Sequence, residues 1–368
     1  MFDKRFFGEK IAVNIVLNLK FITFAVSCRA TAEVIIKSIT CSMDLAVIND
    51  LRQRRLAFYL AEEEYLAKTY PDRDFFFAWQ VLPSVIIGRN QLLEKEINVG
   101  FCREHGVEIF RRKSGGGAVV ADMNNIMFSY VTSSDDVCTT FGEYTSMVAA
   151  ALRQLGLDAS DNSRNDILIG SRKVSGNAYY HLPGRSIVHG TMLYDYDPVL
   201  MAGTLRPSDT KLASHGVSST RSRVTTIREH LPDLSIDAFL KHVLDFVAKS
   251  GDTLVLNDDD IREIEKIEQE YYSPSWLAGK NPKGSLHHCE RLDGIGEICV
   301  DMTTDRGNIT SIVLSGDYLG NSDADAVISR LLSSCQYDRE AVGDALDSVD
   351  LQVLIPGLTK EKFINLIF

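Results

Sequence analysis

A basic, glycine-rich run over residues 111–122, RRKSGGGAVVAD, carries residue types that hold anions. Three successive glycines cost backbone entropy on folding, so such a run is useful where the main chain must approach a ligand closely or adopt positive φ. Its N–H groups can meet a carboxylate or a phosphate, and the arginines before it add permanent charge and paired donors. The run therefore predicts a site for a small anion, with a glycine-rich hairpin beside a solvated basic patch as the alternative.

A second basic stretch follows, with RND at residues 164–166 and GSRKVSGNA at residues 170–178. Lys173 opens a series of small residues, so its ammonium group can enter a crevice and stabilise negative charge developing on a carboxylate or an α-phosphate. Asp166 can orient Lys173 or hold Mg²⁺ through oxygen. A solvated surface lysine and a turn-forming aspartate are the competing interpretations.

Two further segments contain polar groups among small residues: HGTML at residues 189–193 and GVSSTRSRV at residues 216–224. A lone histidine entering a strand, such as His189, is more often structural than catalytic. The second segment is a loop that can fold over an anion or lie in solvent.

The sequence also argues against several kinds of site. It contains no G-x-x-x-x-G-K-[ST] phosphate loop and no G-x-G-x-x-G fingerprint, so any nucleotide is held in another way. The net charge of −11 argues against a nucleic-acid binder. Basic residues nevertheless gather between Arg111 and Arg228, and an acidic protein with one cationic region suits a small anionic ligand.

Short strands interleaved with a few helices must position these residues. Apolar spacing predicts helices over residues 56–66, 98–105 and 141–155, the first of them amphipathic. It predicts strands over residues 75–81, 85–87, 107–111, 117–121, 126–132, 166–169, 173–179 and 187–193. Because tight turns join these strands more often than helices do, we expect an α+β fold with a mixed or antiparallel sheet and flanking helices.

The composition changes near residues 250–260, where an acidic stretch precedes one containing Pro, Gly and Trp. A chain of 368 residues exceeds the size at which one core usually stops growing, so a large and a small domain are expected. In the second, residues 296–302 and 308–314 predict a hairpin around Asp305–Arg306–Gly307.

The amino-terminal segment is apolar over residues 11–26, but Asn14, Asn18 and Lys20 interrupt it, so it is a poor membrane span. We expect that Met43 is the true start or that residues 1–42 are a dispensable extension.

The seven cysteines include no CxxC pair, so the sequence offers no disulfide framework and no zinc pattern. Reduced thiols are the expectation.

Taken together and in order, RRKSGGGAVVAD, RND with RKVSGNAYY, HGTML and GVSSTRSRV resemble the motifs of lipoate–protein ligases. LAFYLAEEEYL and SVIIGRNQ upstream resemble that family's first helix and first strand turn. The resemblance covers roughly residues 43–228, and the segment after about residue 255 looks like the accessory domain of two-domain bacterial members. It implies a catalytic domain over residues 43–255 and an accessory domain over residues 256–368.

The resemblance also implies roles for particular residues, with Lys173 as the catalytic residue that touches both substrates. The positions that match the ATP and adenylate site are Arg112, Gly117, Ala118, Val119, Val120, Asn165, Asp166, Lys173 and Arg221. Those that match the lipoate site are Ser114, Gly115, Gly116, Lys173, Ser175, Gly176, Ala178 and His189.

The implied reaction joins lipoate to ATP, with Mg²⁺, and then passes the lipoyl group from lipoyl-AMP to a lysine. The implied acceptors are apo lipoyl domains of 2-oxoacid dehydrogenase acyltransferase subunits and the glycine cleavage H protein. We expect a cytoplasmic monomer that binds neither nucleic acid nor membrane.

Two departures from the family pattern keep rival interpretations open. Ala121 stands where the family usually has His, and Asn124 stands where it has Gly, a change that looks benign because Asn tolerates positive φ. Octanoyl transferases share the fold but use a cysteine and no ATP, and Cys138 is a possible nucleophile by position. A non-catalytic lipoate binder is a further alternative, and the RRKSGGG run argues against a biotin–protein ligase.

Overall fold

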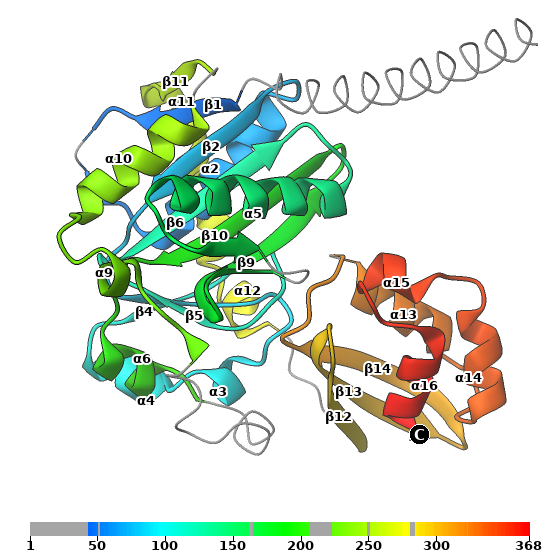
Figure 1. Cartoon of the computed structure of the whole chain (residues 1–368). Helices are drawn as coiled ribbons and strands as arrows, with labels where there is room; N and C mark the ends of the chain where they lie inside the picture. The colour runs from blue at the N-terminus through cyan, green and yellow to red at the C-terminus, as the bar shows by residue number, and fades with distance from the viewer. Residues whose placement is uncertain are drawn as a thin grey trace, which may run out of the picture.

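The computed structural model describes residues 43–50, 52–161, 165–206, 223–248, 251–279, 284–321 and 323–368. The predicted extension over residues 1–42 lies outside these ranges. Figure 1 shows two units, a larger one built around an eight-stranded sheet and a smaller one built around a three-stranded sheet. Both combine strands with segregated helices, so the α+β expectation is confirmed.

The large sheet has the strand order β11-β1-β2-β6-β10-β9-β8-β7 and is mixed. β1 pairs in parallel with β11 and β2, and every other neighbouring pair is antiparallel. The strands are β1 (Met43–Ile48), β2 (Asp74–Trp79), β6 (Asn125–Thr132), β7 (Ala159–Asp161), β8 (Asp166–Ile169), β9 (Arg172–Leu182), β10 (Arg185–Leu193) and β11 (Thr253–Leu256).

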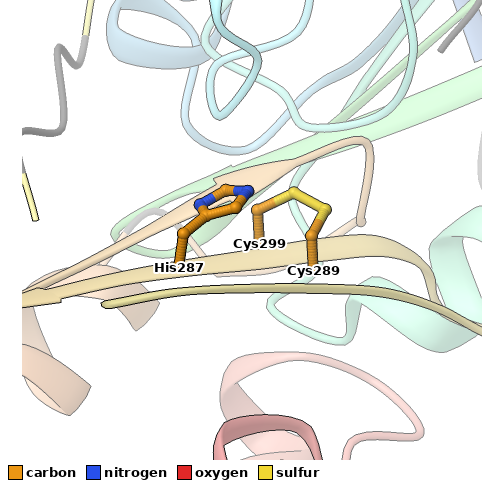
Figure 2. A group of neighbouring side chains, drawn as sticks. All are labelled: His287, Cys289 and Cys299. Carbon is orange, nitrogen blue, oxygen red and sulfur yellow. A yellow bond between two sulfur atoms is a disulfide. The ribbon is translucent and has the colours of Figure 1, made fainter. Parts of the chain in front are cut away.

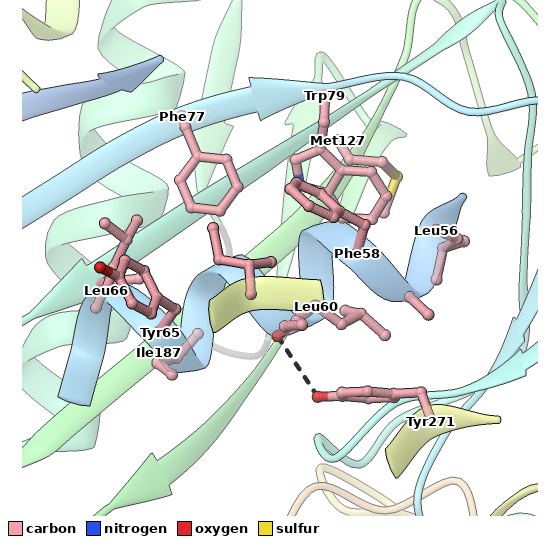
Figure 3. Packing of buried hydrophobic residues seen from close by; sticks show 14 of the residues in the cluster. Leu56, Phe58, Leu60, Tyr65, Leu66, Phe77, Trp79, Met127, Ile187 and Tyr271 are labelled. Atoms are coloured by element: carbon pink, nitrogen blue, oxygen red, sulfur yellow. Dashed lines mark hydrogen bonds between the residues drawn. The ribbon is translucent and has the colours of Figure 1, made fainter. Parts of the chain in front are cut away.

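Helices cover both faces of this sheet, and the two-residue period of β2 explains why. Phe75, Phe77 and Trp79 enter the cluster under α2 (Leu56–Thr69) and α11 (Asp258–Tyr271), whereas Phe76 enters the opposite cluster. That second cluster lies under α5 (Val137–Gln154) and α10 (Ile236–Val247). Figure 3 shows Phe77 and Trp79 packed against α2. Because both faces are covered, the strands are buried on both sides.

Helix α2 is buried on nearly every side. An amphipathic helix, as expected over residues 56–66, would expose its acidic residues, but Glu62, Glu63 and Glu64 are all buried. The sheet covers one side of the helix, and α11 covers another, where Tyr65 donates to Asp260 and Tyr271 donates to Glu64. The helix prediction is therefore confirmed, and its polar face is not solvated.

Burial of Glu62 makes stability depend on pH. Burial, reinforced by the charge of Glu63, raises the pKa of Glu62 from 4.5 to about 8. The folded state then keeps a proton that the unfolded chain releases, so the stabilising contribution is lost as pH rises from about 4.5 to about 8. Glutamine at position 62 cannot ionise. Between about pH 6 and about pH 9, Glu62→Gln is therefore expected to lose on the order of 2 kcal/mol less stability than the parent chain. Urea midpoints at both pH values test this, and equal slopes for the variant and the parent chain would contradict it.

A smaller sheet, β4-β3-β5, lies beside the large one and carries the glycine-rich run between two of its strands. β3 (Ser84–Ile87) pairs in parallel with β4 (Glu108–Arg111) and antiparallel with β5 (Val119–Ala121). Short helices pack around it: α3 (Leu93–Glu96), α4 (Val99–Glu104) and α6 (Pro198–Thr204), with α9 (Ile227–His230) further along the chain.

The first unit extends beyond the boundary at 255/256 that the sequence suggested. Leu256, Ile264 and Tyr271 share one hydrophobic cluster with α2, so β11 and α11 fold with this unit. Helix α12 (Pro274–Ala278) also packs on it, because Trp276 Nε1 donates to the carbonyl oxygen of Arg111 at 2.9 Å. The change in packing therefore falls after α12.

The second unit is an antiparallel sheet of β12 (Leu286–Leu292), β13 (Gly296–Asp305) and β14 (Asn308–Gly316). The predicted hairpin is confirmed, and Arg306 and Gly307 at its turn both have positive φ. Helices α13 (Ala324–Leu332), α14 (Arg339–Leu346), α15 (Leu351–Leu354) and α16 (Lys360–Ile367) close a separate core on one face (Figure 1). No helix within the described ranges is long and apolar enough to cross a membrane.

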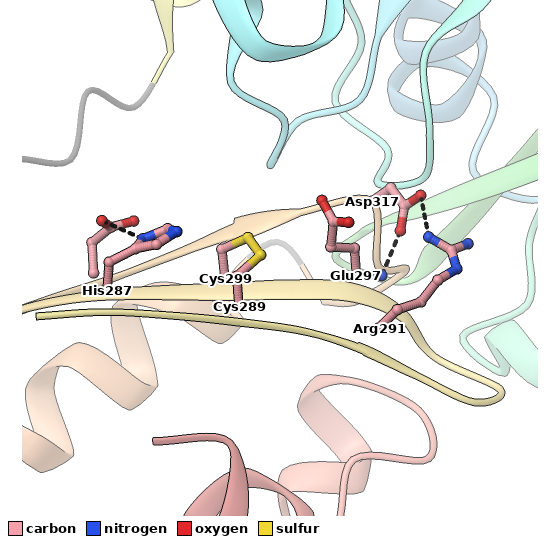
Figure 4. Close-up of a disulfide and its surroundings, with 7 residues drawn as sticks. His287, Cys289, Arg291, Glu297, Cys299 and Asp317 are labelled. Atoms are coloured by element: carbon pink, nitrogen blue, oxygen red, sulfur yellow. Dashed lines mark hydrogen bonds and ion pairs between the residues drawn. A yellow bond between two sulfur atoms is a disulfide. The ribbon is translucent and has the colours of Figure 1, made fainter. Parts of the chain in front are cut away.

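One expectation about the cysteines is corrected. Cys289 and Cys299 were expected to be free thiols, but they face each other across β12 and β13 and form a disulfide (Figure 4). Strand pairing brings them together, which the spacing of the residues in the sequence did not reveal. Cys102 and Cys335 are free thiols.

Candidate active site

A cavity of about 290 Å³ opens between β9 and β10 of the large sheet and the glycine-rich run that leads into β5. Much of its wall comes from residues that the sequence singled out: Arg112, Gly116, Gly117, Ala118, Val119, Val120, Asn165, Lys173, Gly176, Ala178 and His189. The rest of the wall includes apolar side chains, among them Leu60, Trp79, Ile86, Met127, Leu193, Met201 and Leu205. The cavity thus has a cationic, glycine-lined part and an apolar part.

Lys173 lies at this cavity with Asp166 beside it. Its Nζ is 2.6 Å from Asp166 Oδ1, across the antiparallel pair of β8 and β9. The side chain passes over Gly176, where a Cβ atom would lie 2.6 Å from Nζ. Glycine at position 176 therefore leaves the space that Lys173 occupies, and the aspartate holds the ammonium group near the cavity.

Arg112 shapes the glycine-rich run from inside. Its guanidinium donates to Ser114 Oγ at 2.9 Å, to the carbonyl oxygen of Gly115 at 2.6 Å and to that of Gly117 at 2.8 Å. Burial, and after it the charge of Arg111, lower the pKa of Arg112 to about 10, so the group stays protonated at neutral pH. The arginine thereby fixes the loop and brings a positive charge to the cavity.

A chain of buried hydrogen bonds supports the same loop. His189 Nε2 lies 2.7 Å from Ser114 Oγ, and His189 Nδ1 lies 2.9 Å from Glu63 Oε1. Ser129 Oγ also donates to Glu63 Oε1 at 2.6 Å, and Trp79 Nε1 donates to Ser129 Oγ at 3.0 Å. Both ring nitrogens of His189 are engaged, so its main contribution is to position Ser114 and the loop.

Glu63 is a residue that sequence reasoning missed. The signal was present, because three successive helical residues span about 200° of the helix surface. Glu62, Glu63 and Glu64 therefore cannot all lie on one narrow solvent face of a helix that is otherwise apolar. At least one of them had to turn towards the core, where a carboxylate needs a partner.

Lys113 does not line the cavity but holds the glycine-rich run against two helices. Its Nζ lies 2.6 Å from Glu64 Oε1 and 3.2 Å from Glu270 Oε2. Burial on its own would raise the pKa of Glu64, but the charge and hydrogen bond of Lys113, helped by Tyr271, outweigh burial and lower it. The pair ties the glycine-rich run to α2 and α11.

The remaining predicted residues lie at or behind the wall. Ser114 is buried against His189, and Ser175 is buried with its hydroxyl donating to Asn177 Oδ1 at 3.1 Å. Gly115 lies against Tyr318 of the second unit. Arg221 lies outside the described residues, as does most of the 216–224 loop.

The two departures from the family pattern differ in their surroundings. Asn124 and Asn125 do not adopt positive φ, since Arg306 and Ser334 are the only non-glycine residues that do so within the described ranges. They instead donate to the carboxylate of Asp122, through Asn124 N at 2.8 Å and Asn125 Nδ2 at 3.1 Å. The expectation that Asn124 is tolerated because it adopts positive φ is therefore wrong. Ala121 is buried in the core cluster.

Cys138 belongs to the first turn of α5, but its side chain lies outside the described part of the structure. Among the described residues, no cysteine lines the cavity.

The second unit contacts the glycine-rich run directly. Gly116 N donates to the carbonyl oxygen of Tyr318 at 3.2 Å, and a Cβ atom on Gly115 would lie 2.5 Å from the same oxygen. A Cβ atom on Gly117 would have no heavy atom within 4 Å. The two glycines therefore form a matched pair for testing this contact.

Gly115→Ala is expected to lower the free energy of unfolding by about 1–3 kcal/mol, because backbone on one side must move. Gly117→Ala is expected to change it by less than about 0.5 kcal/mol. Urea unfolding of both variants checks this, and equal losses would show that the contact with Tyr318 does not restrict position 115.

The fold and this cavity suit a small anionic ligand that carries an apolar group. Residues 55–248 match the model described as the lipoyl protein ligase A/B catalytic domain, and residues 281–367 match the bacterial lipoate protein ligase C-terminus. Lipoate-protein ligase LplJ of Bacillus subtilis is 36% identical over 318 residues, covering 84% of this chain and 96% of the relative. The chain belongs to the lipoate–protein ligase family.

Two solved structures are similar to this chain in fold. LipL1 of P. falciparum, in complex with lipoate, is 19% identical with a TM-score of 0.69, covering 88% of this chain and 97% of that one. A lipoate-protein ligase A bound with ATP is 25% identical with a TM-score of 0.54, covering 64% of this chain and 98% of that one. The family resemblance noted from the motifs is confirmed.

Proposed function

We propose that the protein is an ATP-dependent lipoate–protein ligase with two half-reactions at one site. The observation that carries the proposal is a single cavity that joins Lys173, the glycine-rich run and an apolar wall. This combination suits a carboxylate on an apolar tail together with the phosphates of a nucleotide. Membership of the ligase family and the similar chain that binds ATP support the same assignment.

In the first half-reaction a carboxylate oxygen of lipoate attacks the α-phosphorus of ATP, and pyrophosphate leaves. Lys173 stabilises the negative charge that builds up around the phosphorus, and Asp166 keeps its ammonium group in place. The backbone N–H group of Gly117, in the run that Arg112 fixes, is a further donor. The apolar wall around Trp79 and Met127 takes the hydrocarbon and dithiolane part of lipoate.

In the second half-reaction the amine of a partner lysine attacks the acyl carbon of lipoyl-AMP. The amide bond forms, the bond from the acyl carbon to the phosphate oxygen breaks, AMP leaves, and the amine proton passes to solvent. Exclusion of water from the cavity protects the anhydride before the partner arrives. The acceptors are apo lipoyl domains of 2-oxoacid dehydrogenase acyltransferase subunits and the glycine cleavage H protein, and the protein acts as a cytoplasmic monomer.

Mg²⁺ is part of the proposal as the partner of the ATP phosphates. This ion takes oxygen ligands and prefers one or two carboxylates together with phosphates and water. Asp166 fits that requirement, because its carboxylate is partly exposed beside the cavity. When bound, the ion would neutralise part of the triphosphate charge.

The unit boundary and the site roles belong to the same proposal. We place the end of the catalytic domain after α12, because α11 and α12 pack on it, and the accessory domain from β12 onwards. The predicted ATP and lipoate residues keep the roles stated above, including Arg221.

The test is the intact mass of an apo lipoyl domain after incubation with the protein, lipoate and Mg²⁺, with and without ATP. A gain of one lipoyl group only with ATP, together with release of pyrophosphate, is the expected result. No mass gain and no pyrophosphate would instead support a non-catalytic binder.

Transfer without ATP from an octanoyl carrier thioester would support the octanoyl transferase alternative. That transfer would then be lost in Cys138→Ser. An ATP-dependent reaction that is unchanged in Cys138→Ser excludes a cysteine nucleophile at this position.

A further inference from the structure

Four side chains with metal-ligating atoms share one face of the second unit's sheet. The register of β12 and β13 pairs His287 with Asp301 and Cys289 with Cys299. Alternate residues of a strand point to the same face, so these two cross-strand pairs lie side by side. The residues that alternate with them on β13, Ile298, Val300 and Met302, point to the opposite face and belong to the hydrophobic core. The four side chains are therefore held together by strand pairing and take no part in that core.

The ligating atoms are close enough to share one ion. The imidazole of His287 and the sulfur atoms of Cys289 and Cys299 all lie within 4.8 Å of one another. Figure 2 shows the three side chains on the side of the sheet that faces the catalytic unit, away from the helices. Cys299 is buried, whereas His287 and Cys289 are exposed. One side of the group is therefore enclosed by the protein, and the other side is open to solvent for entry of an ion.

Asp301 supplies a second and independent observation. Its Oδ1 lies 2.9 Å from His287 Nδ1. Its Oδ2 is buried and has no hydrogen-bond partner within the described part of the chain, although the residue is only 9% exposed. A buried carboxylate oxygen without a donor is costly, and a cation beside it would remove that cost.

Arg291, a cation on the same face of β12, is already paired with Asp317 and does not cancel the negative charge of the cluster. Arg291 Nη1 lies 3.2 Å from Asp317 Oδ2, and Asp317 Oδ1 accepts from Glu297 N at 2.6 Å (Figure 4). Glu297 is the next residue on the same face of β13 and adds a carboxylate. Thiolates, an imidazole and carboxylates together favour a divalent transition metal over Mg²⁺ or Ca²⁺.

We propose that the reduced protein binds one Zn²⁺-type ion through His287, Cys289 and Cys299, with Asp301 orienting the His287 ring, and that the disulfide is the oxidised, metal-free state. A small thiol reductant transfers two electrons and two protons to the disulfide and is itself oxidised to a disulfide. The ion then displaces the two thiol protons and takes both sulfurs as thiolates. The two states exclude each other because the same sulfur atoms form either the S–S bond or the metal bonds.

The absence of CxxC pairs from the sequence does not exclude this group, because that spacing belongs to metal sites on a knuckle or a helix and this group spans two strands. On a hairpin the ligands come as H-x-C on one strand and a facing Cys on the next, with the turn setting the distance between them.

The test measures metal binding to the full chain, reduced and then freed of small thiols, with Co²⁺ as the spectroscopic probe and Zn²⁺ as competitor. The reduced protein is expected to bind one Co²⁺ with thiolate charge-transfer absorption, and Zn²⁺ is expected to displace it. Oxidation of the protein is expected to abolish binding. Cys289→Ser and Cys299→Ser should remove the thiolate bands, and Asp301→Asn should weaken binding by about 10–100-fold.

Matched controls keep the proposal falsifiable. His288→Ala removes the neighbouring histidine, whose Nε2 contacts Tyr337 instead, and Cys335→Ser removes a free thiol elsewhere in this unit. Both are expected to bind Co²⁺ like the parent chain, and unchanged thermal unfolding shows that each variant folds. The proposal is overturned if the reduced chain binds no ion, if Cys289→Ser keeps the thiolate bands, or if His288→Ala loses them equally.

Discussion

Lys173→Ala is expected to lower the rate of lipoyl-adenylate formation by about 10²–10³-fold, equivalent to about 2.7–4 kcal/mol of barrier. The loss follows from the position of the ammonium group, which reaches the cavity over Gly176 and is held by Asp166 at 2.6 Å. A charge held in place before the reaction stabilises the transition state without the cost of reorganisation. Because that charge is greatest in the transition state, kcat should fall by more than KM rises.

Pyrophosphate release measures the first half-reaction, and transfer from supplied lipoyl-AMP to an apo lipoyl domain measures the second. Lys241→Ala is the matched control, since Lys241 is an exposed lysine paired with Asp245 at 2.6 Å on α10. It should retain the activity of the parent chain. A Lys173→Ala variant within about threefold of the parent in pyrophosphate release would remove Lys173 from the chemistry and require another source of positive charge.

Lys173 and the glycine-rich run could be predicted from the sequence because their local composition is unusual and does not depend on distant residues. Glycines that cost entropy, and a lysine among small residues, indicate a site wherever the chain folds. The strands next to them could be predicted for the same reason, since short runs of apolar residues, such as residues 107–111 and 173–179, are a local property of the sequence.

The partners of these residues could not be predicted, because they come from pairing between distant segments. Glu63 supports His189 only because α2 lies across β6 and β10, and α11 covers the opposite side of that helix. The same limit applied to Cys289 and Cys299, which strand register brings together. It also applied to α11, which the acidic stretch placed in the predicted accessory domain although its apolar residues pack on α2.

The basic run RRK shows this limit most clearly, since three adjacent cations have three different environments. Arg112 holds the glycine-rich run, and Lys113 pairs with Glu64 and Glu270. Arg111 is almost completely buried and faces the carbonyl oxygens of two other segments. The charge of these residues suggested a solvated basic patch as the alternative to an anion site, yet Arg111 and Arg112 are buried.

Arg111→Met is expected to lower the free energy of unfolding by about 3–5 kcal/mol. The guanidinium donates to the carbonyl oxygens of Gly88, Arg89 and Gln91 at 2.9, 3.0 and 2.7 Å. It also donates to those of Leu277 at 3.1 Å and Ala278 at 3.2 Å, at the end of α12. Methionine fills similar space but donates to none of them, so five acceptors lose a charged donor at once.

Burial lowers the pKa of Arg111 to about 10, so the group is still charged at neutral pH and the loss should not depend on pH between about 6 and about 8. Urea midpoints with an unchanged m-value measure it. Arg228→Met, which removes an exposed arginine paired with Asp195 at 2.9 Å, should cost less than about 1 kcal/mol. Arg111→Lys keeps the charge but not the five-donor fork, so it should recover less than half of the loss. If Arg111→Met instead unfolds within about 1 kcal/mol of the parent chain, the carbonyl oxygens must find water in its place, and Arg111 would not be what joins the 88–91 loop to α12.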